Sequence, residues 1–235
     1  NAEIRRATSA VLVLDGPGVE HITSSALGSR RYLIDLKGPG GHSWNDFGRV
    51  NPIHALAGAI RRIEDIRLSS EPRSTISVGI IEGGTTVNSI PPAAWMKVDI
   101  RSTSMAEIER LSKSLQQAVR EALNDEVERA AGALELRTVM LGERPAATAI
   151  PGSKMVEILT KADQLLGIRS TQRCSSTDAN VPLALGIDTV TIGGGGTGGG
   201  AHTVEEWYDP QGRELGIRSE EHTSELQSRF GISYA

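Results

Sequence analysis

The chain has 235 residues, of which 38% are hydrophobic and 23% charged, as in an ordinary globular protein. A net charge of -4 and only 3% aromatic residues argue against nucleic-acid binding, which normally needs a basic face or stacking aromatics. No apolar run approaches the roughly 18 residues of a membrane span, so we expect no membrane association. The single cysteine, Cys174, excludes an intrachain disulfide and favours a cytoplasmic protein. Because the chain begins at Asn1 rather than Met, the sequence does not test for a preceding signal peptide.

The first predicted element is a buried strand over residues 11–14, which the turn sequence Asp15-Gly-Pro-Gly ends. A second strand is expected over residues 20–26. Asp15 would then lie at the carboxyl end of a strand, where open α/β sheets bind ligands, and its carboxylate could hold a cation such as zinc. Taken alone, Asp15 is more often a turn residue.

Residues 31–142 predict the order strand, helix, strand, strand, helix, strand. The first helix follows Pro52 with apolar residues at helical spacing, and the second is expected to begin with a capping box of Ser104 and Glu107. This order is typical of the split βαβ, or ferredoxin-like, unit. It predicts a four-stranded antiparallel sheet with both helices on one face. The expected strands are residues 31–37, 75–81, 95–100 and 134–141.

Helices and strands alternate again after Pro145, with helices expected over residues 153–167 and 178–186 and a buried strand over 188–192. The sequence therefore predicts the α/β class, with the β-α-β-β-α-β unit inserted into a larger α/β domain. Cys174 has no histidine at an obvious spacing, so we do not expect it to be a nucleophile.

A glycine-rich loop, residues 193–200, follows the last predicted strand and leads to His202. A neutral imidazole there could ligate a metal, and glycines such as Gly200 would let backbone N–H groups approach a substrate closely. The alternative is a flexible loop with an incidental histidine, followed by Glu205 and Glu206 as helix-start carboxylates. A phosphate-binding loop is excluded because no Gly-Lys-Ser/Thr sequence follows.

Three polar residues of the middle segment lie where strands end. His42 stands in Gly-Pro-Gly-Gly-His-Ser-Trp, whose glycines expose its side chain, so a functional role is about as expected as a structural one. Asn88 would ordinarily be a turn residue between two strands. Arg101 suits bidentate carboxylate recognition, although a surface ion pair is the default for an arginine.

The last eighteen residues, 218–235, match the translation of a common DNA-sequencing adapter from Arg-Ser-Glu-Glu-His-Thr-Ser-Glu-Leu-Gln-Ser onward. We therefore expect this tail not to be native and exclude it from the fold. The expected organisation has four parts. Residues 1–30 end a first catalytic segment, residues 31–143 form the inserted domain, residues 144–217 form a second catalytic segment, and residues 218–235 are adapter.

Five motifs in one order resemble peptidase family M20, the aminoacylase, carboxypeptidase G and tripeptidase group of dinuclear zinc hydrolases. They are Gly-Pro-Gly-Gly-His42-Ser-Trp, Gly-Gly-Thr-Thr-Val-Asn88-Ser-Ile-Pro, Asp-Ile-Arg101-Ser, Ser-Thr-Asp-Ala-Asn, and Gly-Gly-Gly-Ala-His202-Thr-Val-Glu-Glu-Trp-Tyr-Asp. The resemblance covers nearly all of residues 8–217 and is greatest to the di- and tripeptidase branch. It implies a zinc-peptidase catalytic domain with an inserted lid that also dimerises.

The resemblance also implies roles for single residues. Asp15 and His202 would be metal ligands for two zinc ions, and His42 would reach from the lid into the partner subunit to stabilise the oxyanion. Asn88, Arg101 and Gly200 would bind the substrate, a peptide or an N-acyl amino acid. Metal-activated water would attack the amide carbonyl.

The family's other metal ligands and its general-base glutamate precede the position of Asp15, and residues 1–14 hold only Glu3 as a carboxylate and no histidine. We therefore expect an inactive fragment of a larger homodimeric hydrolase. Two alternatives remain: a non-catalytic dimerisation or peptide-binding module, and an N-acyl amino acid amidohydrolase of the same family.

Overall fold

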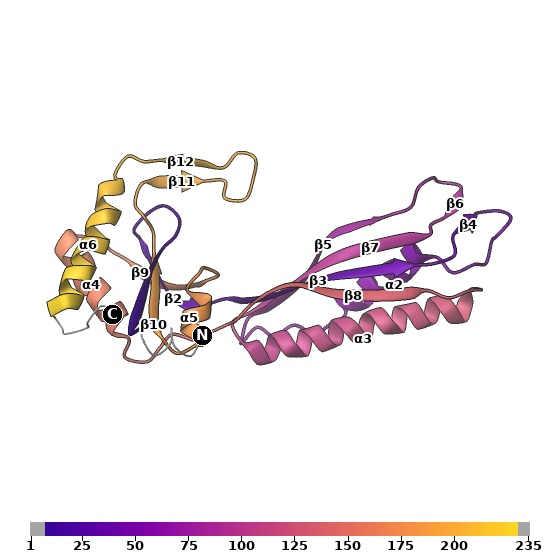
Figure 1. Cartoon of the computed structure of the whole chain (residues 1–235), viewed down its shortest axis with the longest axis horizontal. Coiled ribbons are helices and arrows are strands. Elements are labelled where there is room, and N and C mark those ends of the chain that lie inside the picture. Colours follow the sequence, from indigo (N-terminus) through magenta and orange to yellow (C-terminus); the bar gives the residue numbers. More distant parts are fainter. Residues whose placement is uncertain (1–7, 230–235) are drawn as a thin grey trace. The chain divides into compact units, whose positions relative to one another are not determined.

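The computed structural model describes residues 8–229 and divides the chain into two compact units. One, here called the lid, is Gly28–Arg144. The other, here called the α/β unit, combines Asn1–Leu27 with Pro145–Ala235. Figure 1 draws both units. Residues 1–7 and 230–235, which begin the first expected segment and end the expected adapter tail, lie outside the described residues.

The lid is built on a four-stranded antiparallel sheet in the order β5-β7-β3-β8. Its strands are β3 (Gly28–Lys37), β5 (Ser74–Gly83), β7 (Ala93–Ser102) and β8 (Glu135–Arg144). The central pair, β3 and β7, keeps one register over ten residue pairs, from Gly28↔Ser102 to Lys37↔Ala93. This topology confirms the ferredoxin-like arrangement predicted from the sequence.

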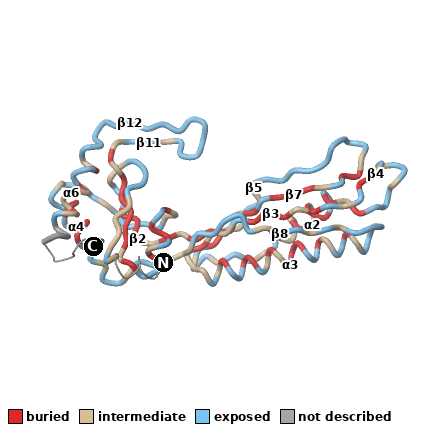
Figure 2. Tube along the Cα trace, viewed as in Figure 1, coloured by how far each residue is buried: buried red, intermediate tan, exposed pale blue. Residues whose placement is uncertain are grey.

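Both helices, α2 (Pro52–Glu64) and α3 (Met105–Arg129), pack on the same face of the lid sheet. The apolar side chains of β7 alternate, so that Met96 and Ile100 point into the core while Lys97 and Arg101 lie on the other face. Leu56 from α2 and the buried stripe of α3 complete one continuous core. Figure 2 marks the buried positions of this core along β3, β7 and α3.

The two lid helices begin differently. The Asn51 side chain accepts hydrogen bonds from the N–H groups of Ile53 (2.9 Å) and His54 (3.4 Å), so α2 has a side-chain N-cap. Ser104 precedes α3 but its side chain makes no capping hydrogen bond.

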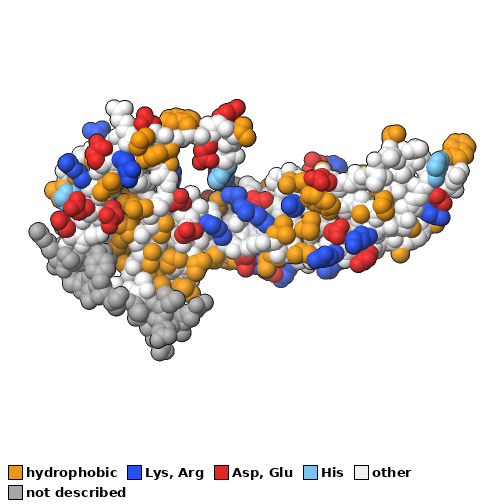
Figure 3. All heavy atoms as spheres, turned by 45° about the horizontal axis from the view of Figure 1, so that its top comes forward, with side chains coloured by type: hydrophobic (Ala, Val, Ile, Leu, Met, Phe, Trp, Pro, Cys, Tyr) orange, Lys and Arg blue, Asp and Glu red, His pale blue; other side chains and the backbone are white. Residues whose placement is uncertain are grey.

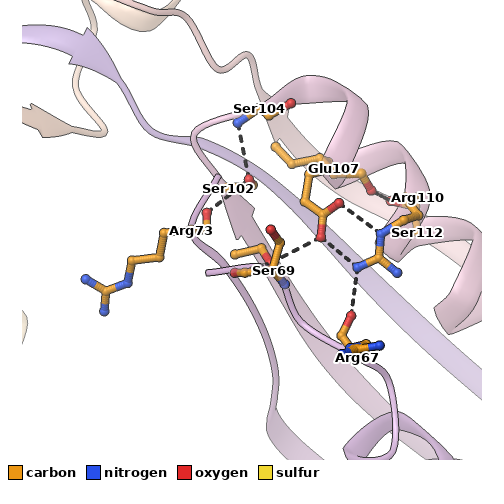
Figure 4. Close-up of polar contacts among 10 residues, drawn as sticks. Arg67, Ser69, Arg73, Ser102, Ser104, Glu107, Arg110 and Ser112 are labelled. Carbon is orange, nitrogen blue, oxygen red and sulfur yellow. Dashed lines mark hydrogen bonds and ion pairs between the residues drawn. The ribbon is translucent and has the colours of Figure 1, made fainter. Parts of the chain in front are cut away.

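The capping box predicted for Ser104 and Glu107 is therefore wrong, because other groups occupy the carboxylate of Glu107. Arg110 donates two hydrogen bonds to it, at 2.6 and 2.9 Å, and the Ser74 hydroxyl donates a third. The Ser104 N–H instead donates to the hydroxyl of Ser102 (3.2 Å). Figure 4 shows this cluster at the start of α3.

The α/β unit contains a mixed sheet in the order β1-β10-β2-β9. Its strands are β1 (Ala10–Leu14), β2 (His21–Ala26), β9 (Thr171–Ser175) and β10 (Asp188–Ile192). β1 runs parallel to β10, and β9 parallel to β2, while β10 and β2 are antiparallel. The strand predicted at residues 11–14 exists but is half-buried rather than buried, because β1 stands at one end of this sheet order. β9 was not predicted.

Three helices accompany this sheet: α4 (Lys154–Leu166), α5 (Asn180–Ala184) and α6 (Arg213–Arg229). The helix predicted over residues 178–186 is shorter than expected. α6 continues through the first part of the expected adapter segment, where Ser219 and Thr223 are buried. No helix among residues 8–229 is long and apolar enough to cross a membrane.

Candidate functional site

Asp15 lies at the carboxyl end of β1, beside the glycine-rich loop that follows β10. β1 and β10 pair up to Leu14↔Ile192, and the Asp15 N–H donates to the Ile192 carbonyl (2.9 Å). Beyond this point the backbones stay close. The Gly194 N–H donates to the Gly16 carbonyl (2.9 Å), and Gly195 and Gly18 exchange two hydrogen bonds.

Glycine is required in this contact because the two backbones nearly touch. A Cβ placed on Gly193 would lie 2.2 Å from the Gly18 carbonyl oxygen and 2.6 Å from that of Pro17. A side chain there would force the glycine-rich loop away from the turn that follows Asp15. The glycines thus hold the segment that leads to His202 next to Asp15.

Residues of the turn after Asp15 and of the segment around His202 line one pocket of about 410 Å³, here called the glycine pocket. Several of them belong to a hairpin of β11 (Thr197–Gly199) and β12 (Trp207–Asp209). The lining residues are Gly16, Pro17, Gly198, Gly199, Ala201, Glu206, Trp207 and Tyr208.

His202 has an unusual backbone conformation, with φ at 67°, and its side chain is exposed. A non-glycine residue in this region is uncommon and costs free energy. The Glu206 carboxylate accepts the His202 N–H (3.2 Å) and also lines the glycine pocket. Glu205 and Glu206 do not begin a helix, because β12 follows them directly.

Aspartate and histidine side chains such as those of Asp15 and His202 are common zinc ligands, but a protein zinc site normally has at least three protein ligands. Within residues 8–229, no group of three His, Cys, Asp or Glu side chains could hold a metal ion. The described part of the chain therefore does not form a complete metal centre. Although Cys174 is exposed, desolvation by neighbouring groups raises the pKa of its thiol, which disfavours the thiolate that a nucleophile or ligand needs.

The lid carries His42 and Asn88 together at one end. β4 (Gly41–His42) and β6 (Ser89–Ile90) pair antiparallel, with His42 opposite Ser89, and the Ser43 N–H donates to the Asn88 carbonyl (3.0 Å). Both His42 and Asn88 are exposed. Figure 3 shows hydrophobic side chains beside a histidine at the lid end that carries β4 and β6 in Figure 1. Exposed hydrophobic residues here are Trp44, Phe47 and Val87.

Arg101 lies at the opposite end of the lid, next to the last residue of β7. Its Nε–H donates to the Asp99 carboxylate (2.6 Å), which also accepts a hydrogen bond from Arg31 (3.0 Å). The guanidinium carries five N–H donors in all. Its other N–H groups can therefore form a pair of hydrogen bonds with a second carboxylate. Asp99 was not singled out from the sequence; its position two residues before Arg101, on the same strand face, is the signal that could have found it.

The two groups of lid residues are far apart. β7 begins at Ala93, close to β6, and eight residue steps separate Ala93 from Arg101. At about 3.3 Å per residue, these steps span about 26 Å. One lid therefore does not bring His42 and Asn88 to the same small molecule as Arg101.

Comparison with known proteins identifies the lid. The model of the M20 peptidase dimerisation domain matches residues 25–127. No curated protein sequence matches the chain.

Solved structures share the fold of both units. Aminopeptidase PepT from Bacillus cereus ATCC 10987 is 22% identical at a TM-score of 0.71, over 92% of this chain and 57% of PepT. A tripeptidase from Staphylococcus aureus is 17% identical at a TM-score of 0.77, over 94% and 57%. An amidase of the hydantoinase/carbamoylase family from Burkholderia vietnamiensis is 18% identical at a TM-score of 0.71, over 96% and 55%.

The chain thus spans little more than half the length of these structures. At these identities the likeness concerns the fold. Residues 25–127 thus match the dimerisation domain of M20 peptidases, and the solved structures show the fold of both units.

Proposed function

We propose that this chain is part of a metal-dependent hydrolase that cleaves peptide or related amide bonds and acts as a homodimer through its lid. The observation that carries the proposal is the glycine pocket, which is lined by residues next to Asp15 and by residues next to His202. A carboxylate and an imidazole at the carboxyl end of a parallel strand pair suit a metal-dependent site. The remaining ligands and the general base would lie in a longer protein.

The lid supplies the polar groups that a peptide substrate requires. Arg101 would bind the substrate carboxylate through its guanidinium, held in place by Asp99. His42 would donate a hydrogen bond to the carbonyl oxygen as negative charge develops on it, and Asn88 would contact the substrate beside it. Gly200 would offer its backbone to the substrate.

The separation along β7 supports a site shared between two copies of the chain. A di- or tripeptide is much shorter than the roughly 26 Å between Arg101 and the end of the lid that bears His42. Arg101 from one copy and His42 with Asn88 from the other would have to meet around one substrate. Such an exchange is reciprocal in a two-fold symmetric dimer.

Mixing two inactive variants of the longer protein tests this proposal. His42→Ala and Arg101→Ala should each lose most activity on a panel of di- and tripeptides. A 1:1 mixture allowed to exchange subunits should regain about a quarter of wild-type activity, because half of the dimers are mixed and each has one intact site. His54→Ala, an exposed lid histidine, is the matched control and should remain active.

Failure of the mixture to regain activity would contradict the shared site. Asp15→Ala and His202→Ala should lower both metal content and kcat, the latter at least about a hundredfold. A longer protein that dimerises without binding metal or hydrolysing any amide would instead be a binding module. A preference for N-acyl amino acids over peptides would identify an amidohydrolase of the same family.

A further inference from the structure

Two backbone N–H groups point at one nitrogen of the His42 ring. The N–H of Trp44 donates to Nδ1 at 3.1 Å, and the N–H of Asn45 approaches the same atom at 3.4 Å. A backbone N–H cannot accept a hydrogen bond, so Nδ1 must be the nitrogen without hydrogen. In the neutral ring the hydrogen is then on Nε2.

The segment that supplies these N–H groups, residues 42–50, is here called the tip loop, and Asp46 closes it on itself. The Asp46 carboxylate accepts the His42 N–H (2.8 Å), while the Asp46 N–H donates to the His42 carbonyl (2.9 Å). A Cβ on Gly41 would lie 2.8 Å from both Cβ and Oδ2 of Asp46, so only glycine lets Asp46 approach this closely.

The other end of the tip loop is fixed to α3 and to Gly40, which precedes β4. Arg49 forms an ion pair with Asp46 (2.8 Å) and donates to the Gly40 carbonyl (3.2 Å). The Asn51 N–H donates to the buried carboxylate of Glu126 (2.9 Å). The loop is thus tied on both sides although it is largely exposed.

We propose that Asp46 is a positioning residue that holds the tip loop so that Trp44 and Asn45 lock His42 as its Nε2–H tautomer, which presents a hydrogen-bond donor. This inference rests on the proposed function for the use of that donor, the stabilisation of an oxyanion. Asp46 does not touch the substrate. It acts by fixing the peptide N–H groups that select the tautomer.

Nitrogen-15 NMR of the imidazole groups in the full chain tests the tautomer directly, with His42→Gln to assign the signals. At about pH 8, where ordinary imidazoles are neutral, His42 should show a pyridine-type Nδ1 and a pyrrole-type Nε2 resonance. Asp46→Ala should shift both resonances toward a common averaged value and raise hydrogen exchange of the Trp44 amide about tenfold. Asp46→Asn, which keeps an acceptor oxygen, should largely restore the wild-type spectrum, and Asn45→Ala should not change it.

A pyrrole-type Nδ1 in the wild-type chain would overturn the inference without any variant. An unchanged His42 spectrum in Asp46→Ala would overturn the role of Asp46. Both results are independent of hydrolysis. The expected spectrum combined with failed subunit mixing would refute the shared site alone, whereas successful mixing with an unaltered Asp46→Ala spectrum would refute this inference alone.

Discussion

The lid and the α/β unit bury different kinds of side chain. The lid has one continuous apolar core, in which Ile34, Met96 and Leu111 are fully buried. The α/β unit has two small apolar clusters, around Leu159 and around Leu183. Many of its other buried residues are polar: Thr23, Ser24, Asp163, Thr177, Asn180, Thr189, Thr191, Ser219 and Thr223.

This difference shows which unit carries its own stability. Burial of apolar area is the dominant favourable term in folding, whereas a buried hydroxyl gains little net free energy even when it is hydrogen-bonded. The lid sheet is covered by two helices that the same unit supplies. We therefore expect the lid to fold on its own and the α/β unit to be the weaker of the two.

Matched core substitutions test this comparison and should have the largest effects. Leu115→Ala in the lid and Leu159→Ala in the α/β unit each empty a fully buried site, which costs about 2–5 kcal/mol. We expect Leu115→Ala to lower the denaturation midpoint of a lid that still folds. Leu159→Ala should unfold the α/β unit.

Hydrogen exchange resolved by peptide distinguishes the units in both variants. The lid of Leu159→Ala should keep wild-type protection. Loss of that protection would mean that the lid depends on the other unit for its fold.

Two serine substitutions test helix capping at a smaller scale. Ser153 caps α4: its hydroxyl accepts the Val156 N–H (3.1 Å) and donates to Asp188 (2.6 Å). Ser153→Ala should therefore cost the α/β unit about 0.5–2 kcal/mol in free energy of unfolding. Ser104→Ala should cost the lid less than about 0.5 kcal/mol, because the Ser104 side chain makes no capping hydrogen bond. Equal losses in denaturant titrations would contradict the assignment of the caps.

One carboxyl group in each unit should contribute to stability with the opposite dependence on pH. Hydrogen bonds from Arg110 lower the pKa of Glu107, so its contribution is present above the ordinary pKa of about 4.3 and lost as pH falls through the lowered value. Burial raises the pKa of Asp163, against hydrogen bonds from Ser170 and Ser219. Its contribution is present below about pH 3.9 and lost as pH rises through the raised value.

Replacing each carboxylate with a neutral amide should change stability in opposite directions. At pH 7, Glu107→Gln should destabilise the lid by up to about 1 kcal/mol. Asp163→Asn should stabilise the α/β unit by an amount on the order of 1 kcal/mol. Both effects should shrink as pH falls toward about 3, where ordinary carboxyl groups are largely protonated, and the effect of Glu107→Gln should vanish only below the lowered pKa of Glu107. Thermal unfolding at the two pH values measures them, and a stabilising effect of Glu107→Gln at pH 7 would contradict the role of Arg110.

The lid could be predicted from the sequence because its apolar residues repeat at regular strand and helix spacings. β3 and β7 alternate, and the buried positions of α2 repeat at helical spacing. β9, with the sequence Thr-Gln-Arg-Cys-Ser, has no such pattern because four of its residues are exposed. The hairpin of β11 and β12 was missed because glycines give no strand signal.

Single residues of the candidate site could be predicted from the sequence, but their arrangement in space could not. Asp15 and His202 were singled out by their positions after strands, but the glycine contacts between their segments join residues far apart in the chain. Nothing local in the sequence encodes such a pairing. The capping box failed for a related reason, because Arg110 and Ser74 compete for Glu107.

The uninterrupted pairing of β3 with β7 also limits how the length of the lid can differ between related proteins. The neighbouring pairs, β3 with β8 and β5 with β7, each contain a register shift, but the central pair contains none. A one-residue deletion in β7 would turn every later side chain to the other face and bury Lys97 in place of Met96. Homologues with a longer or shorter lid should therefore differ by two residues in both central strands, in steps of about 6.6 Å.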